Sequence, residues 1–294
     1  MLKNANHCNH CNYIYEISYC ILFQHTVFLF LLLFQLKTIF YPDIFLGIIQ
    51  GITEFLPISS SGHLVVFSSL FKENNFSTNE IAFLHLGTVL SILFFYYKDL
   101  INLMKNKSSL LKIIKLLIVG MIPAAFVGLV FPISQLIDES KYILLITGFA
   151  YIFFSVIMYY SEKIDEGETI IENISIKEAF TIGVAQSFAL LPGVSRSGIT
   201  LITAMILKIK KTDAIFFSLL LGIPTIFGAW LITLLQSSEG INSNLIIPTL
   251  FAFVAGTIAI KILVNFTVNS KLKIFSYYCF AIGIISCGAY LINL

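Results

Sequence analysis

Six long apolar runs dominate the chain and leave few architectures open to it. They cover residues 81–97, 110–131, 142–160, 214–235, 245–260 and 274–292. About 20 apolar residues in a helix are enough to cross the hydrocarbon core of a bilayer. Only 12% of the residues are charged, far below the share usual in soluble domains. The sequence therefore predicts an all-α polytopic membrane protein.

The remaining composition restricts the partners. The formal net charge is only +2, and the lysines stand in short connections between the apolar runs, so we expect membrane lipids as partners and no nucleic acid. Residues 1–39 are predicted to be an N-terminal extension of a membrane domain that spans 40–294. Within the extension, residues 17–36 either form an extra uncleaved helix or lie upstream of the true start.

The chain contains an internal repeat. The stretch GIIQGITEFLPISSSG at 47–62 is similar to GVAQSFALLPGVSRSG at 183–198, with Gln50, Ser59 and Gly62 displaced by 136 positions. Further glycine, leucine and tyrosine matches continue at 135 or 136 positions for more than a hundred residues. We therefore divide the domain into repeat one, 40–161, and repeat two, 176–294.

Each repeat begins with an apolar segment that a Pro/Ser/Gly turn interrupts. Neither arm of that segment is long enough to span a bilayer, so we expect a re-entrant helix pair that enters and leaves on one side. Three full spans follow in each repeat. An odd number of crossings inverts the second repeat relative to the first, which predicts two inverted repeats with their broken segments facing each other.

Two charged residues stand inside this apolar sequence. Glu54 is the sole acid between Asp43 and Glu73, and Arg196 is the sole arginine of the chain. Buried charges in membrane segments are costly and often functional, and a guanidinium suits bidentate recognition of phosphate or carboxylate. The alternative is a structural ion pair between Glu54 and Arg196 that locks the repeats together.

Hydroxyl groups surround both charges, which favours the functional interpretation. Each turn also opens a new helix, whose free N–H groups suit an anion. We expect the two turns to converge on one phosphate site, with these candidate phosphate-binding residues: Ser59, Ser61, Gly62, Ser195, Ser197, Gly198 and Thr200.

The histidines and glutamines divide into direct and supporting candidates. His63 follows the first turn and can serve as general acid, general base or nucleophile. His85 lies in the middle of an apolar run and is more simply a packing or supporting histidine. Gln50 shares a helix face with Glu54 at a spacing of four and can orient it, and Gln186 is its equivalent in repeat two.

The motifs QGITEFLPISSSGH at 50–63 and LPGVSRSGIT at 191–200 resemble those of the undecaprenyl-diphosphate phosphatase family of the bacitracin-resistance type. The resemblance covers about 40–294. It implies hydrolysis of undecaprenyl diphosphate to undecaprenyl phosphate and inorganic phosphate. That reaction recycles the lipid carrier of peptidoglycan synthesis and confers bacitracin resistance. It also implies a divalent cation, Mg²⁺ or Ca²⁺, and a multi-pass location in the bacterial cell (inner) membrane.

The resemblance assigns roles by position. The second glutamate of the family's acidic motif falls on Glu54, as base or metal ligand, and its first acidic position is Gln50 here. The essential serine and histidine fall on Ser60 and His63, and the arginine of the second motif on Arg196. The nucleophile stays open between Ser60, His63 and water.

A transporter or flippase of a phosphorylated polyprenyl lipid or small anion is the main alternative, because inverted repeats with broken helices also build secondary transporters. Transport alone has less use for Glu54 and His63 together. A homodimer is left open by the sequence.

Overall fold

The computed structural model of the chain describes residues 42–71, 78–131, 140–236 and 243–292. The predicted extension at 1–39 lies outside these residues. Within them, α-helices and short 3₁₀ turns form every regular element apart from one isolated bridge between Thr169 and Ile209. The prediction of an all-α membrane protein is confirmed.

The first half of the described chain follows the predicted order of a broken segment and three spans. Its elements are α2 (Pro42–Phe55), α3 (Ser60–Phe71), α4 (Thr78–Phe95), α5 (Tyr97–Lys105), α6 (Lys107–Val130) and α8 (Ile143–Tyr160). The second half has the same order, and the short 3₁₀ turns η1 (Ser161–Lys163) and η2 (Ile171–Asn173) lie between the halves. Its elements are α9 (Ile176–Ser187), η3 (Phe188–Leu190), α10 (Arg196–Ile206), α11 (Lys211–Gln236), η4 (Ser243–Leu245), α12 (Ile246–Val268) and α13 (Lys273–Ile292).

Five described helices are long and apolar enough to cross a membrane: α6, α8, α11, α12 and α13. Helices α4 and α5 together form a sixth candidate, bent by 66° near Tyr96. The lysine-rich connection between the apolar runs 81–97 and 110–131 is therefore mostly helical. Helix α12 also continues past the expected end at residue 260, because Lys261 is tolerated in an otherwise apolar helix.

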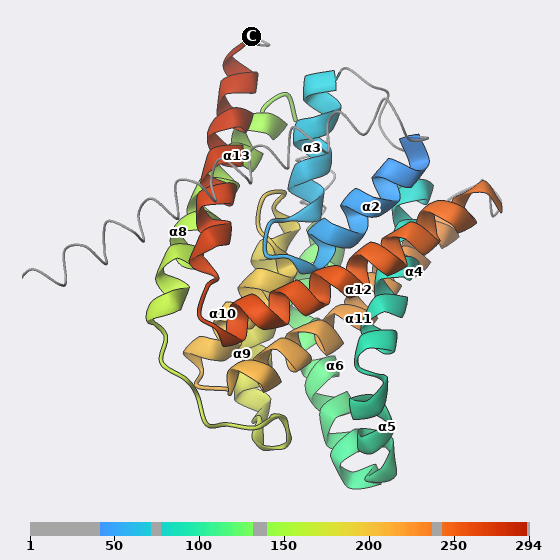
Figure 1. Cartoon of the computed structure of the whole chain (residues 1–294), viewed down its shortest axis with the longest axis vertical. Coiled ribbons are helices and arrows are strands. Elements are labelled where there is room, and N and C mark those ends of the chain that lie inside the picture. The colour runs from blue at the N-terminus through green and yellow to red at the C-terminus, as the bar shows by residue number, and fades with distance from the viewer. Residues whose placement is uncertain (1–41, 72–77, 132–139, 237–242, 293–294) are drawn as a thin grey trace, which may run out of the picture.

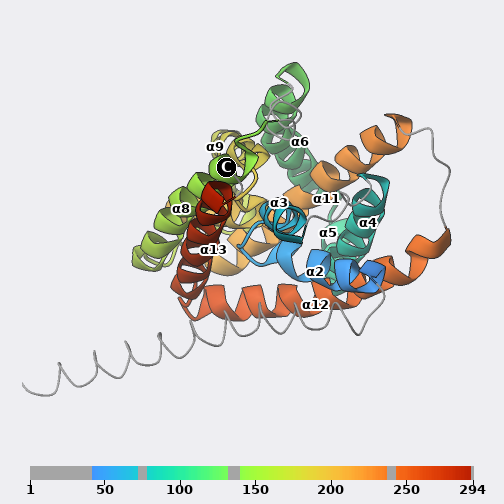
Figure 2. The same cartoon turned by 90° about the horizontal axis from the view of Figure 1, so that it is seen from above.

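The two halves interlock. Helix α2 lies along α12, α9 lies along α6, and α8 pairs with α13, so each pairing joins one half to the other (Figures 1 and 2). Glycines permit this approach: a Cβ atom on Gly183 of α9 would collide with the backbone carbonyl of Gly120 on α6. The inverted relation of the two halves and their boundaries stay predictions.

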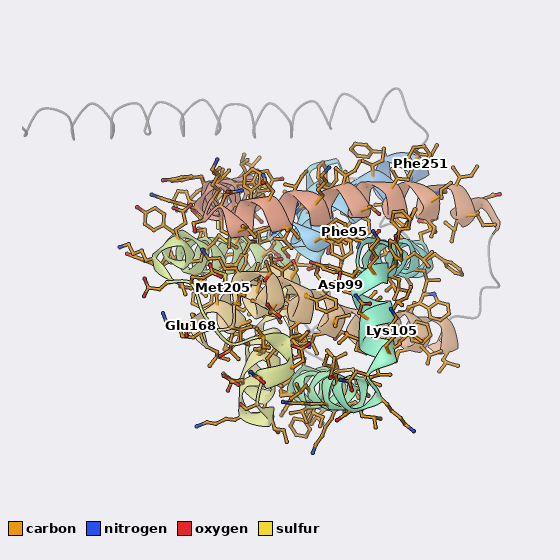
Figure 3. All side chains as sticks on the ribbon, turned by 60° about the horizontal axis from the view of Figure 1, so that its bottom comes forward. Phe95, Asp99, Lys105, Glu168, Met205 and Phe251 are labelled. Atoms are coloured by element: carbon orange, nitrogen blue, oxygen red, sulfur yellow. The ribbon has the colours of Figure 1, made fainter. Side chains whose placement is uncertain are left out.

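The core lies where the halves meet. Phe55, Tyr151, Phe154 and Phe217 are fully buried there. Many large apolar side chains point outward instead, for example Phe94, Leu129 and Ile258, as expected where lipid replaces water. Figure 3 labels Lys105 on α5 and Glu168 in the connection between the halves, whose side chains are exposed, and Met205 on α10, which is buried.

Acidic side chains near the connection between the halves cap helix ends. Glu162 accepts a hydrogen bond from the backbone N–H of Lys273, where α13 begins (3.1 Å). Glu166 accepts one from the backbone N–H of Lys211, where α11 begins (3.0 Å). Carboxylates near helix N-termini satisfy free N–H groups and complement the helix dipole. The connection thereby fastens two spans of the second half.

Candidate active site

Both interrupted segments use a serine to begin their second helix. The side chain of Ser59 accepts a hydrogen bond from the Gly62 N–H, and Ser195 accepts one from the Gly198 N–H, both at 3.3 Å. These serines are N-caps of α3 and α10, and they occupy matching positions of the repeat. The two serines and two glycines thus have a local structural role in addition to the phosphate binding predicted for them.

The two turns are in direct contact. The backbone N–H of Gly193 donates to the Ser59 hydroxyl (3.1 Å), and the Ser197 hydroxyl donates to the Phe55 carbonyl (3.0 Å). Gly193 has a φ of +104°, a conformation that favours glycine. The expected convergence of the two motifs is therefore seen in the structure.

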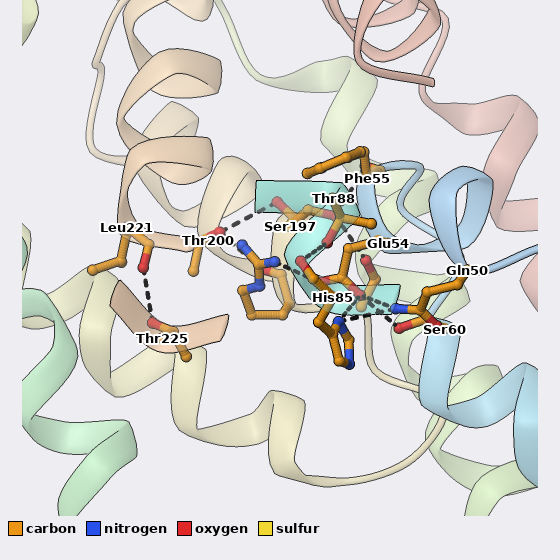
Figure 4. A network of polar contacts seen from close by, with 12 residues as sticks. Gln50, Glu54, Phe55, Ser60, His85, Thr88, Ser197, Thr200, Leu221 and Thr225 are labelled. Atoms are coloured by element: carbon orange, nitrogen blue, oxygen red, sulfur yellow. Dashed lines mark hydrogen bonds and ion pairs between the residues drawn. The ribbon is translucent and has the colours of Figure 1, made fainter. Parts of the chain in front are cut away.

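Glu54 lies at the point of convergence (Figure 4). Its Oε1 atom is 2.6 Å from Nη2 of Arg196, which belongs to the other half. Its Oε2 atom accepts hydrogen bonds from the Ser60 hydroxyl and from Nε2 of Gln50, each at 3.0 Å. Nδ1 of His85 lies 3.5 Å from the same oxygen. Side chains from four helices, α2, α3, α4 and α10, thus meet around one carboxylate.

The pair of Glu54 and Arg196 joins the halves, as the structural alternative requires, but the guanidinium is not fully used. Its Nη1 atom is buried and has no hydrogen-bond partner among the described residues. Buried donors without partners are rare and costly, and a bound anion would satisfy this one. This unsatisfied donor favours a binding role beyond the ion pair.

Gln186 does not join the cluster around Glu54. It is 2% exposed, and neither amide atom has a hydrogen-bond partner among the residues that the structure describes. The repeat therefore places an equivalent of Gln50 in the second half, but without a carboxylate to orient. Its role as a supporting residue stays a prediction.

His63 occupies a different environment from the one expected. Its Nδ1 atom contacts the Ser59 carbonyl (2.7 Å) and the Tyr151 hydroxyl (2.9 Å), and its Nε2 atom contacts the Tyr278 hydroxyl (2.5 Å). The ring is 2% exposed, and no hydrogen bond in the described part of the chain joins it to Glu54. His63 thus connects the first turn to helices α8 and α13 through its hydrogen bonds. A catalytic role for it stays a prediction.

The remaining hydroxyls of the second turn are occupied within the protein. Thr200 donates to the Arg196 carbonyl (2.8 Å) and contacts the Ser218 hydroxyl (2.6 Å). Ser197 and Thr200 are fully buried. In the first turn, by contrast, Ser61 is exposed and Ser60 is partly exposed, so the hydroxyls available to a ligand lie mainly on that side.

The donor set fits a metal ion only in part. Among the described residues no group of three His, Cys, Asp or Glu side chains could hold one. Mg²⁺ is commonly bound by one or two carboxylates together with substrate phosphates and water. Glu54 can provide one such carboxylate, so a divalent cation fits this site only in company with phosphate oxygens.

Sequence reasoning missed three residues around the site. Tyr151 and Tyr278 hold His63, but tyrosines in apolar spans are usually interfacial, so the sequence carried no signal for them. Gly222 allows the Arg196 side chain to pass, because a Cβ there would collide with the guanidinium. Gly222 is one of the glycine matches of the repeat, 135 positions after Gly87, and that match was a usable signal for a packing constraint.

Comparisons with known proteins agree with the motifs. Residues 43–285 match a family model described as "Bacitracin resistance protein BacA". An undecaprenyl-diphosphatase of Thermosipho africanus is 41% identical over 248 residues, which cover 83% of this chain and 97% of the relative.

Other relatives carry the same description. One from Methanococcus vannielii is 38% identical over 247 residues, with 81% and 95% of the two chains covered. Undecaprenyl-diphosphatase 4 of Bacillus thuringiensis is 37% identical over 245 residues, with 82% and 93% covered. Similarity thus extends over nearly the whole length of each relative.

Proposed function

The chain belongs to the family of the bacitracin resistance protein BacA, and from this we propose that it is an undecaprenyl-diphosphatase whose active centre is Glu54. It hydrolyses undecaprenyl diphosphate to undecaprenyl phosphate and inorganic phosphate. In a bacterium this multi-pass protein lies in the cell membrane, where the reaction returns the lipid carrier to peptidoglycan synthesis. The family assignment disfavours the transport alternative.

One observation carries the assignment of the site: Glu54 and Arg196, 142 positions apart, meet at 2.6 Å beside the Ser60 hydroxyl. Phosphoryl transfer needs charge neutralisation and in-line positioning of an attacking group. Arg196 provides the positive charge, and because its buried Nη1 donor has no partner among the described residues, we expect it to donate to a phosphate oxygen. Ser60 provides a hydroxyl already hydrogen-bonded to a carboxylate.

We assign the attack to Ser60, among the three nucleophiles that the sequence leaves open. Glu54 accepts the hydroxyl proton, and the Ser60 oxygen attacks the terminal phosphorus. The bond from that phosphorus to the bridging oxygen breaks, and undecaprenyl phosphate leaves. Water then hydrolyses the phosphoserine. His63 is less suited to attack, because both ring nitrogens are occupied and the ring is buried.

A divalent cation, Mg²⁺ or Ca²⁺, completes the proposal. Glu54 would be its protein ligand, and the remaining ligands would be diphosphate oxygens and water. When bound, the ion neutralises phosphate charge. The orientation of Glu54 by Arg196 and Gln50 does not depend on it.

The test is phosphate release from undecaprenyl diphosphate by the purified protein, with Mg²⁺, with Ca²⁺ and with a chelator. We expect cation-dependent release that Glu54→Gln and Arg196→Ala abolish while the exposed control Glu168→Gln retains it. Brief reaction with a substrate labelled in its terminal phosphate should label wild type and Ser68→Ala, and not Ser60→Ala. Release without a labelled protein would assign the attack to water. No release by folded wild type under any cation would overturn the function.

A further inference from the structure

His85 lies outside both motifs, yet it takes part in the same cluster. It belongs to α4, and its Nδ1 atom lies 3.0 Å from Nε2 of Gln50 and 3.5 Å from Oε2 of Glu54. The structure gives Nε2 of His85 no hydrogen-bond partner among the described residues. The two ring nitrogens therefore have different surroundings: one inside the cluster, the other free.

The contacts of Gln50 decide which nitrogen carries the proton. A carboxylate only accepts hydrogen bonds, so the Gln50 amide must turn its NH₂ group toward Glu54 (3.0 Å). The same NH₂ group faces Nδ1 of His85, which must then be the acceptor. A neutral imidazole whose Nδ1 accepts carries its proton on Nε2. Gln50 thereby sets the tautomer of His85.

The His85 side chain is more exposed than the two charged members of the cluster. The His85 side chain is 25% exposed, compared with 13% for Arg196 and 7% for Glu54. Nδ1 is directed at Gln50 and Glu54, and Nε2 is the ring nitrogen that these two residues leave without a contact. Figure 4 shows His85 beside Glu54, together with Ser60 and Gln50.

We propose that His85 is a further catalytic residue, whose Nε2–H donates a hydrogen bond to a phosphoryl oxygen of the diphosphate. This rests on the proposed function of the Glu54 site. Arg196 pairs with Oε1 of Glu54, and His85 lies near Oε2, so the two donors flank the carboxylate. The histidine acts as a neutral donor and transfers no proton. Its bond stabilises the charge on the phosphoryl oxygens during transfer.

The same geometry explains why the first acidic position of the motif can hold a glutamine here. A carboxylate at position 50 would need a proton from Nδ1 of His85. In the neutral ring, the Nε2 atom would then be the acceptor and would repel a phosphate oxygen. Gln50 and His85 therefore act as a pair: the amide orients and the imidazole binds.

Activity measurements on three variants test the donor. His85→Leu removes it, and we expect kcat to fall about 10²-fold, the usual cost of one transition-state donor. His85→Gln places an amide N–H near the position of Nε2, so it should restore most of that loss. Gln50→Glu should resemble His85→Leu. Wild-type kcat in folded His85→Leu, or equal loss in folded His85→Gln, would overturn the proposal.

Nitrogen-15 NMR of the five histidines gives a readout that a structural role would not change. The resonance absent in His85→Gln belongs to His85. We expect the Nε2–H tautomer, and a shift of that signal when methylene diphosphonate is added. The Nδ1–H tautomer, or no shift while the diphosphonate binds, would overturn the proposal. The NMR measurement does not require phosphate release, so a negative result there is distinct from a failure of the proposed function.

Discussion

A Cβ atom placed on Gly222 would collide with the guanidinium of Arg196. Gly222 belongs to α11, whereas Arg196 begins α10 and reaches across to Glu54 in the other half. Because position 222 has no side chain, there is room for the guanidinium of Arg196, which joins the two motifs.

Gly222→Ala should displace the guanidinium and lower kcat about 10²-fold, because small misplacements of a catalytic group are that costly. The matched control is Gly228→Ala on the same helix, where a Cβ meets nothing within 4 Å. The control should keep its activity and its melting temperature. Steady-state phosphate release and thermal unfolding in detergent measure both. Unchanged kcat in Gly222→Ala would mean that catalysis does not depend on the space that Gly222 leaves for the Arg196 guanidinium.

Arg196→Lys should retain the fold and lose activity. Lysine keeps the charge for Glu54 but lacks the second donor of the planar fork, the one that is unsatisfied in the structure. We expect kcat to fall about 10²-fold, the loss typical for one donor to the transferred group. Phosphate release at saturating substrate checks this. Near wild-type kcat in the lysine variant would show that charge alone suffices.

Tyr278→Phe should destabilise the protein by about 1–3 kcal/mol, because it leaves the buried Nε2 of His63 without its partner. Chemical denaturation in detergent measures the change in the free energy of unfolding. Tyr97→Phe, at a half-exposed tyrosine, is the control and should have little effect. Activity corrected for the folded fraction should remain measurable. Lost activity with full stability would instead make His63 a participant in the chemistry.

Glu162→Ala and Glu166→Ala should each lower the free energy of unfolding by about 1 kcal/mol, which is the usual contribution of a helix N-cap. Each removes the acceptor for the first N–H of a helix, α13 and α11 respectively. Glu168→Ala, in the same connection and exposed, should leave the melting temperature unchanged. Thermal unfolding of the three variants side by side compares them. Equal stability of all three would mean that water replaces these carboxylates freely.

Much of the fold could be predicted because membrane spans are long and apolar. The limits of α8 and α13 agree with the predicted runs at 142–160 and 274–292. Helix α5 could not be recognised in the same way. It follows a bend near Tyr96 and contains lysines, so it does not stand out as an apolar run. Hydropathy measures burial in lipid and carries no information on such a bend.

The site was predictable where polar groups interrupt apolar sequence. Glu54, Ser60 and Arg196 stand out for that reason, and the structure places them together. The roles of His63 and His85 could not be predicted from the sequence, because they depend on which side chains surround each ring in the fold. Two tyrosines from distant helices enclose His63, while His85 lies open beside Gln50. A one-dimensional pattern contains neither fact.

The pairing of α2 with α12 and of α9 with α6 has a consequence for biosynthesis. The first broken segment leaves the ribosome long before residues 246–268, its packing partner, are translated. Until residue 196 is translated, Glu54 has no arginine to pair with, and until α12 is made, the side of α2 that packs against it is uncovered. The helix that carries Glu54 thus gains this packing partner only after most of the chain is made, and a nascent chain that stops before α12 contains every residue of the Glu54 cluster but lacks the helix that packs against α2.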